Sequence, residues 1–195
     1  MPLLICRHGE TESNEEERFQ GITDSRLTKK GIQQAKALGT YLLNEYKPDL
    51  FFVSPAKRAQ KTYVLCKNDF QAECTTMPAL QEVCYGSWEG IQKKNLLNTP
   101  EWKLRELDRF HFRYPDEYEG HRGESYADLY FKLVPFWGKV KNFHKNVVII
   151  AHLGVLLCAK KYFTDINIQE LNAYRPTADT VQYIDLNNTF SEITL

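Results

Sequence analysis

The chain has 195 residues, of which 43% are hydrophobic and 26% are charged, a balance typical of a soluble globular protein with one packed core. Lysine plus arginine and aspartate plus glutamate both number 25, so the net charge near zero gives no support to a nucleic-acid-binding protein. We expect a cytoplasmic protein without a membrane span, because no apolar run approaches roughly 20 residues, no signal-peptide pattern is seen and the five scattered cysteines form no CxxC pair.

The first part of the chain alternates strand and helix patterns. A strand predicted at 3–6 is followed by a helix over 28–46, in which apolar residues recur every three or four positions along one face. Pro48 ends this helix, and a second strand is predicted at 49–54. The residues that follow this strand predict another helix, which starts at Pro55.

The second part of the chain repeats this alternation. A weaker strand is predicted at 73–77, and the helical period returns over 125–143, which opens with a capping-box pattern. Further strands are predicted at 146–151 and 180–186. Because no internal repeat, low-complexity tract or linker divides the chain, we expect a single domain over 1–195.

Apolar strands that alternate with helices predict an α/β fold with a parallel sheet covered on both faces. In such sheets, ligands bind outside the carboxyl ends of the strands. Three predicted strands end in polar residues: Arg7 and His8 follow the first, Ser54 ends the second, and His152 follows the strand at 146–151. We therefore expect these side chains to converge on one crevice.

Two histidines and two arginines in one crevice suit a phosphoryl group. Guanidinium grips phosphate oxygens in bidentate fashion, and imidazolium adds a further donor. The N–H groups at the helix start after Pro55, together with Arg58, also favour an anion. No HxH or HExxH spacing and no flanking carboxylate pair is present, so no metal site is expected. Taken singly, each residue has an ordinary explanation: His8 fits a hydrogen-bonded structural residue, and Arg58 fits a surface cation.

An ordered series of motifs covers nearly the whole chain. It comprises Arg-His-Gly-Glu-Thr at 7–11, Asn14, Gly21, Asp24, Leu27-Thr28 with Gly31, Ser54, Arg58, Ala59, Thr62, LQEVCYGSWEG at 80–90, GES at 123–125, and His152. This series resembles the histidine phosphatase superfamily, in its phosphoglycerate-mutase-like branch. The resemblance implies a three-layer α/β sandwich with a mainly parallel central sheet.

The same resemblance implies roles for individual residues. His8 is the expected nucleophile, which becomes phosphohistidine, and Glu82 is the expected proton donor. Neighbouring arginines should lower the pKa of His8, and a bound phosphate dianion should raise that of Glu82. Neither a metal nor another cofactor is implied. The expected substrate-binding residues are Arg7, Asn14, Gln20, Gly21, Arg58 and His152.

Three features separate this chain from parts of the family. Leu153 follows the second histidine, where the family usually has a small residue, and Gln20 stands where the mutases usually carry Ser or Thr. The segment 91–122 replaces the longer insertion of the mutases and contains single, dispersed cations rather than an adjacent arginine pair. Its aromatic residues favour a lid or specificity insertion, although an ordinary surface helix and loop explain them equally well.

We therefore expect a small phosphomonoesterase that acts on a small phosphorylated metabolite, of the kind that includes α-ribazole phosphatases and broad-specificity phosphatases. A phosphoglycerate mutase is the first alternative, and a non-catalytic phospholigand-binding module of the same fold is the second. Because pocket walls come from a variable segment, the sequence does not specify the leaving group. Neither nucleic acid nor membrane is an expected partner, and both a monomer and a homodimer fit the sequence.

Overall fold

A mixed six-stranded sheet forms the middle layer of the molecule in the computed structural model, which describes residues 2–185, 187 and 189–195. The strand order is β3-β2-β6-β1-β7-β8: β3, β2, β6 and β1 pair in parallel, and β7 pairs antiparallel with both β1 and β8. The expected mainly parallel sheet is thus confirmed. Its strands are β1 (Leu3–Arg7), β2 (Leu50–Val53), β3 (Glu73–Thr76), β6 (Val147–Ala151), β7 (Thr180–Ile184) and β8 (Phe190–Thr194).

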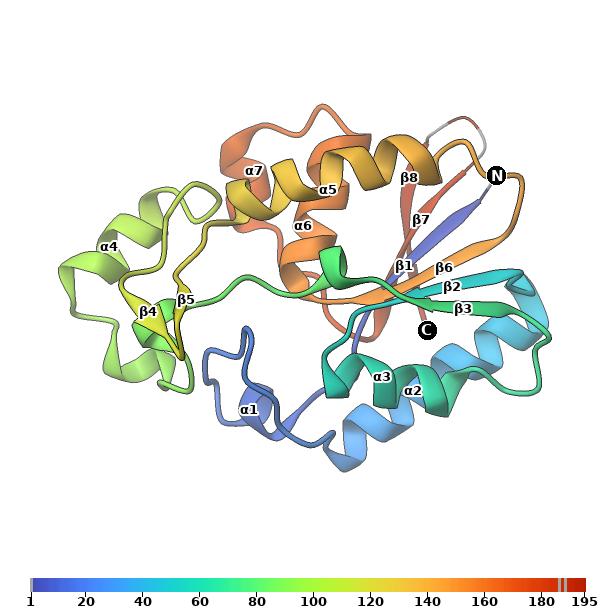
Figure 1. The fold of residues 1–195 in the computed structure, drawn as a ribbon, viewed down its shortest axis with the longest axis horizontal. Coiled ribbons are helices and arrows are strands. Elements are labelled where there is room, and N and C mark those ends of the chain that lie inside the picture. The colour runs from blue at the N-terminus through green and yellow to red at the C-terminus, as the bar shows by residue number, and fades with distance from the viewer. Residues whose placement is uncertain (1, 186, 188) are drawn as a thin grey trace.

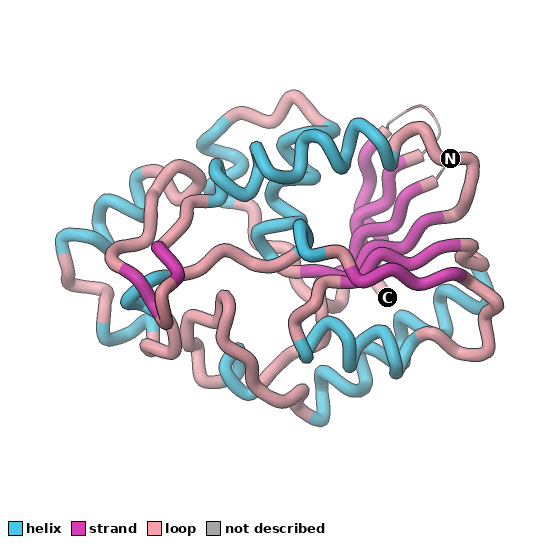
Figure 2. The backbone as a smooth tube through the Cα atoms, viewed as in Figure 1, coloured by secondary structure: helices cyan, strands magenta, loops and turns pink. Residues whose placement is uncertain are grey.

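Helices cover both faces of this sheet, which gives the expected three-layer sandwich (Figures 1 and 2). One face is covered by α2 (Lys29–Tyr41), which continues as the π-helical turn η1 (Leu42–Tyr46), and by α3 (Lys57–Cys66). The other face is covered by α5 (Tyr126–Val140) and α6 (Leu153–Phe163). The shorter helices are α1 (Glu12–Glu15) and α7 (Ile168–Ala173). Among the described residues, no helix is long and apolar enough to cross a membrane.

The two faces of the sheet have separate apolar cores because successive strand residues point to opposite sides. In β1, Leu3 and Ile5 pack with residues of α5 and α6, whereas Leu4 and Cys6 pack with residues of α2 and α3. These four residues are at most 2% exposed. Burial on both faces explains why such a strand appears in the sequence as an unbroken apolar run.

A smaller lobe lies beyond the carboxyl ends of the parallel strands, on the left of Figure 1. Aromatic rings fill it: the ring centroid of Phe19 is 5.1 Å from that of Trp88 and 5.8 Å from that of Tyr114. The segment 91–122 is therefore packed through aromatic contacts with residues outside it. The lobe contains the 3₁₀ turns η3 (Gly86–Trp88) and η4 (Lys93–Asn95), α4 (Pro100–Leu107), and the hairpin of β4 (Glu117–Tyr118) and β5 (His121–Arg122). The 3₁₀ turn η2 (Pro78–Leu80) instead follows β3 and packs against α5.

The predicted elements agree with the structure except at a few points. The helix expected from Pro55 begins at Lys57. The strand expected over 180–186 ends at Ile184, and residue 186 lies outside the described residues. β8 has no counterpart in the prediction, because it is an edge strand whose residues are exposed or half-buried. The capping box that opens α5 is confirmed.

Candidate active site

The polar ends of three parallel strands meet at one point, as expected. The backbone N–H of His8 donates to Ala151 at 2.9 Å, and that of Ser54 donates to Ile150 at 3.0 Å, so β1 and β2 flank the end of β6. The rings of His8 and His152 lie with their centroids 5.2 Å apart and their planes at 61°. The carboxyl edge of the sheet therefore places two histidines side by side.

His8, the expected nucleophile, is held in one orientation and is 3% exposed. Its Nδ1 lies 2.8 Å from the carbonyl oxygen of Gly9, which fixes the Nδ1–H tautomer and leaves a lone pair on Nε2. The Nε–H of Arg58 donates to that Nε2 at 3.2 Å. Burial, together with Arg58 and then Arg7, lowers the pKa of His8 well below its ordinary value, so the ring is neutral at neutral pH.

Arg58 is fully surrounded by partners. Of its five N–H groups, Nε donates to His8, and one on Nη2 donates to Nδ1 of His152 at 3.2 Å. The other three donate to the carbonyl oxygens of Gly21 and Thr23, both at 2.7 Å, and to the carboxylate of Asp24 at 3.1 Å. Only the two N–H groups that face the histidines point toward the expected phosphoryl position.

The start of α3 differs from the sequence expectation. The backbone N–H groups of Lys57 and Arg58 were expected to favour a substrate anion, but both donate to the carboxylate of Asp24, at 2.7 and 3.2 Å. Asp24 thereby supplies the negative charge that a helix N-terminus favours. The helix start is therefore occupied by the protein itself, and Arg58 acts through its side chain alone.

His152 is the N-cap residue of α6 and is 1% exposed. Because its Nδ1 accepts from Arg58, its Nε2 carries the proton and donates to the Ser54 hydroxyl at 2.7 Å. Burial, Arg58 and His8 lower the pKa of His152 well below its ordinary value. The ring is therefore neutral, whereas the sequence reasoning expected an imidazolium here.

Glu82, the expected proton donor, is 4% exposed. Its carboxyl group accepts from the backbone N–H of Gly154 at 3.0 Å and of Val83 at 3.1 Å. Burial raises the pKa of Glu82 and outweighs the opposing effects of these hydrogen bonds and of Arg58 and Arg7. A bound phosphate is therefore not needed to raise it, in contrast to the expectation from the sequence.

The small residue that this site needs is Gly154, and Leu153 is tolerated before it. A Cβ atom on Gly154 would lie 2.2 Å from Glu82 Oε1 and 2.8 Å from the ring of Tyr126. Leu153, in contrast, lines the cavity that contains His8. The departure from the family pattern at position 153 therefore leaves the contact between α6 and Glu82 intact.

The other expected binding residues have different surroundings. Arg7 lines the cavity, and its buried Nε has no partner among the described residues. The Oδ1 of Asn14 accepts from the N–H of Thr11, so its amide nitrogen is the group that can meet a ligand. The amide of Gln20 is bonded to Thr11 and Ser25. Gly21 supports Arg58 through its carbonyl group rather than facing the cavity.

His8 lies in a cavity of about 110 Å³ that adjoins a second one of about 250 Å³. Both are lined by Arg7, His8 and Asn14. The sequence reasoning missed five further cations, which line the first cavity: Arg18, Lys93, Arg105, Arg109 and Arg175. The cations of 91–122 appeared dispersed along the chain, but three of them are gathered here, which corrects that interpretation. Arg105 lies in α4 and Arg109 beyond its end, so no helical spacing in the sequence indicated this grouping.

A larger hollow of about 720 Å³ lies on another side of Glu82 and lacks His8, Arg7 and Arg58 among its lining residues. Its charged side chains are largely paired with one another, as in the contacts of Arg113 with Asp128 and of Lys132 with Glu124. It is therefore not the phosphoryl site.

An α/β sandwich with two histidines and a buried arginine at the strand ends is the architecture of the histidine phosphatases. The chain belongs to the histidine phosphatase superfamily (branch 1), whose family model matches residues 3–193. The expected family and its fold are thus confirmed.

Relatives and solved structures agree with this family. The 6-phosphofructo-2-kinase/fructose-2,6-bisphosphatase 3 of Homo sapiens is 32% identical over 177 residues, which cover 87% of this chain and 31% of that relative. The chain thus spans about a third of the length of the curated relatives that it matches. The crystal structure of the α-ribazole phosphatase from Shigella flexneri is 26% identical, with a TM-score of 0.82 over 100% of this chain and 96% of that one. A phosphoserine phosphatase from Entamoeba histolytica shares the fold, at 22% identity and a TM-score of 0.77 over 99% and 94% of the two chains.

Proposed function

We propose that this protein hydrolyses phosphomonoesters of small metabolites through a phosphohistidine at His8. The observation that carries the proposal is the neutral, oriented His8 ring, whose Nε2 lone pair lies 3.2 Å from Arg58 Nε. A neutral imidazole is a nucleophile, whereas an imidazolium is not. Phosphoryl transfer asks mainly for positioning and for positive charge around the phosphoryl oxygens, which the buried Arg58 and the neighbouring Arg7 supply.

The first step forms the covalent intermediate. His8 Nε2 attacks phosphorus while the bond from phosphorus to the ester oxygen breaks. The two N–H groups of Arg58 that face the histidines are held in place to donate to the phosphoryl oxygens as negative charge develops on them. Glu82, whose pKa burial raises, gives a proton to the leaving oxygen and becomes a carboxylate.

The second step releases phosphate. Water attacks the phosphorus atom of phosphohistidine, and the bond from phosphorus to Nε2 breaks as the new bond to oxygen forms. The Glu82 carboxylate accepts a proton from that water and is thereby restored to its starting state. His8 leaves as the neutral ring, so neither step requires a metal or another cofactor.

We further propose that the substrate carries a second anionic group. Among the described residues that line the smaller cavity, Glu82 is the only acidic one, against the five additional cations and Arg7. Arg109 is 2% exposed, and its Nε is buried without a partner among the described residues. An unpaired buried donor is costly, which favours a site that a ligand oxygen completes. The human relative is named for a sugar bisphosphate, which is consistent with this substrate class.

One observation favours a phosphoglycerate mutase as a second candidate. A mutase must retain a bisphosphorylated intermediate in an enclosed basic cavity, and Arg105 and Arg109, at most 7% exposed, contribute to one here. We rank hydrolysis first because the solved structures at 26% identity are named as phosphatases. A cytoplasmic location and a monomeric or homodimeric state remain predictions from the sequence.

A screen of phosphomonoesters with EDTA present tests the proposal. It compares substrates with one phosphate against those with a second phosphate or a carboxylate, including 3-phosphoglycerate with catalytic 2,3-bisphosphoglycerate. We expect phosphate release that EDTA does not reduce, with the highest kcat/KM for substrates with a second anion. Activity that EDTA abolishes and Mg²⁺ or Zn²⁺ restores would contradict the mechanism. Rapid formation of 2-phosphoglycerate with little phosphate release would favour the mutase.

A further inference from the structure

Glu89 makes an unusual set of hydrogen bonds for a residue with no assigned role. It follows η3 and is 7% exposed. Its Oε1 accepts from the backbone N–H groups of Ile22 and Tyr85, both at 3.0 Å. Its Oε2 accepts from the N–H of Gly21 at 3.1 Å and of Thr23 at 3.4 Å, and from the Thr23 hydroxyl at 2.6 Å. No cation pairs with Glu89 among the described residues.

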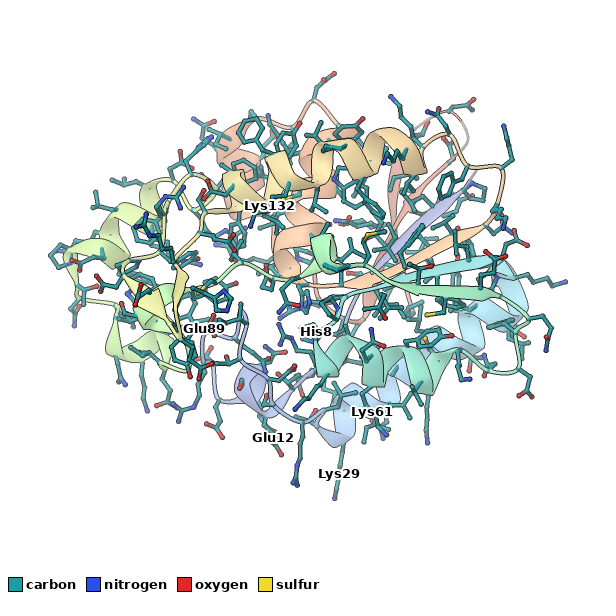
Figure 3. The ribbon with its side chains drawn as sticks, viewed as in Figure 1. His8, Glu12, Lys29, Lys61, Glu89 and Lys132 are labelled. Carbon is teal, nitrogen blue, oxygen red and sulfur yellow. The ribbon has the colours of Figure 1, made fainter. Side chains whose placement is uncertain are left out.

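These bonds fix the loop 21–24, and that loop in turn fixes Arg58. The carbonyl oxygens of Gly21 and Thr23 and the carboxylate of Asp24 accept three of the five guanidinium N–H groups. Glu89 therefore bonds the N–H groups of the same residues whose carbonyl groups hold Arg58. Figure 3 labels His8 and Glu89, which are set apart in that view, and the loop 21–24 connects Glu89 to Arg58, which contacts His8.

The loop and the carboxylate are packed too closely for another arrangement. A Cβ atom on Gly21 would lie 2.1 Å from the carbonyl oxygen of Val83 and 2.3 Å from Glu89 Oε1. The loop can therefore lie this close to the Glu89 carboxylate only because position 21 carries no side chain. The orientation of the Arg58 guanidinium, and of its two N–H groups that face the histidines, follows from these contacts.

We propose that Glu89 is a positioning residue, which orients Arg58 toward the phosphoryl group by holding the loop 21–24. A carboxylate is required because both of its oxygens accept and neither can be replaced by a donor. An amide at this position would place an NH₂ group against at least two N–H donors. The kinetic consequences rest on the proposed function, whereas the orientation of Arg58 is testable through phosphate binding alone.

The substitution Glu89→Gln separates positioning from electrostatics. Removal of a negative charge near an anion site would by itself strengthen phosphate binding. Positioning predicts the opposite: the dissociation constant of inorganic phosphate, measured by calorimetry, should rise. The value of kcat/KM should fall on the order of 10–100-fold, as expected when a reacting group is misplaced by about 1 Å. The loss should be equal for an alkyl phosphate and for p-nitrophenyl phosphate, because Arg58 contacts the phosphoryl group and not the leaving group.

A double-mutant cycle tests whether the effect passes through Arg58. In an Arg58→Lys background, the fork that the loop holds is absent, so Glu89→Gln should cause little further loss. Asp49→Asn is the matched control, because Asp49 also accepts a backbone N–H, from Asn146 at 2.7 Å, where β2 begins. This control should leave kcat/KM unchanged.

Thr23→Val provides a second variant that removes only the hydroxyl bond to Glu89, and it carries the test if Glu89→Gln does not fold. Thr23→Val should lower kcat/KM and weaken phosphate binding less than Glu89→Gln does. Neither effect should appear in the Arg58→Lys background. Equal losses in both backgrounds, or unchanged or tighter phosphate binding, would overturn the inference. If the wild-type protein bound phosphate but hydrolysed no phosphomonoester, the proposed function would fail, while the binding measurements would still decide the role of Glu89.

Discussion

The backbone N–H of Gly154 donates to Glu82 Oε2 at 3.0 Å, so the helix that begins after His152 also holds the expected proton donor. One helix start thus links His152, the neighbour of His8, with the expected proton donor. The link depends on a residue without a side chain, because a Cβ atom there would lie 2.2 Å from Glu82 Oε1.

Gly154→Ala should therefore displace the Glu82 carboxyl group. We expect hydrolysis of an alkyl phosphate to slow by about one to two orders of magnitude, a part of the 10²–10⁴-fold that a positioned acid contributes. Hydrolysis of p-nitrophenyl phosphate should change much less. Gly138→Ala in α5 is the control, since its Cβ would meet only the Tyr162 hydroxyl at 3.9 Å. Equal losses on both substrates would point to general damage rather than to Glu82.

Glu82→Gln should show the same selectivity more strongly. An alkoxide needs a proton to leave, whereas nitrophenolate leaves without one, so kcat for alkyl phosphates should fall by about 10²–10⁴-fold. The measurement is kcat for a matched pair of alkyl and p-nitrophenyl phosphates. If both substrates slowed alike, Glu82 would be a structural residue of this cavity.

The pH dependence of kcat/KM should be bell-shaped. On the acid limb His8 gains a proton and loses its nucleophilic lone pair; because burial and Arg58 lower its pKa, this limb should lie below that of an ordinary histidine. On the alkaline limb Glu82 loses its proton; because burial raises its pKa, this limb should lie above that of an ordinary carboxylic acid. Glu82→Gln should remove the alkaline limb only, and its retention in that variant would assign it to another group.

If the substrate carries a second anionic group, removal of a cation that lines the cavity around His8 should slow some substrates more than others. Lys93 and Arg175 are the cations chosen for this test. Lys93→Met and Arg175→Met should each lower kcat/KM for a substrate with two anionic groups by at least about tenfold, consistent with the roughly 1.5–3 kcal/mol typical of hydrogen bonds to charged groups. Both should leave p-nitrophenyl phosphate unaffected. Lys94→Met is the neighbouring control, because Lys94 does not line either cavity that contains His8. Equal effects on both substrates would exclude a separate subsite.

The sequence predicts the catalytic edge of the fold because the relevant signals are local. Unbroken apolar runs that end just before Arg7-His8 and before His152 are sufficient to place both histidines at strand ends of a parallel sheet. β8 escapes prediction because an exposed edge strand needs no apolar pattern. The family resemblance supplied Glu82, whose burial and raised pKa depend on tertiary packing.

The remaining features of the site depend on contacts between distant segments. Asp24 caps α3 across 33 residues of sequence, and Glu89 reaches the loop at Gly21 across 68. Arg175 enters the same cavity as Arg105 from a different part of the chain. No local period or short motif records such contacts, so the sequence showed these residues as ordinary surface charges or as parts of a family segment.

Detection of phosphohistidine tests the central claim most directly. The protein is mixed with a ³²P-labelled phosphomonoester, quenched within milliseconds in acid or in base, and the label bound to protein is counted. We predict an adduct that is stable in base and labile in acid, and that disappears together with turnover in His8→Ala. An adduct that persists in His8→Ala and is lost in His152→Ala would contradict the assignment of His8 as the nucleophile.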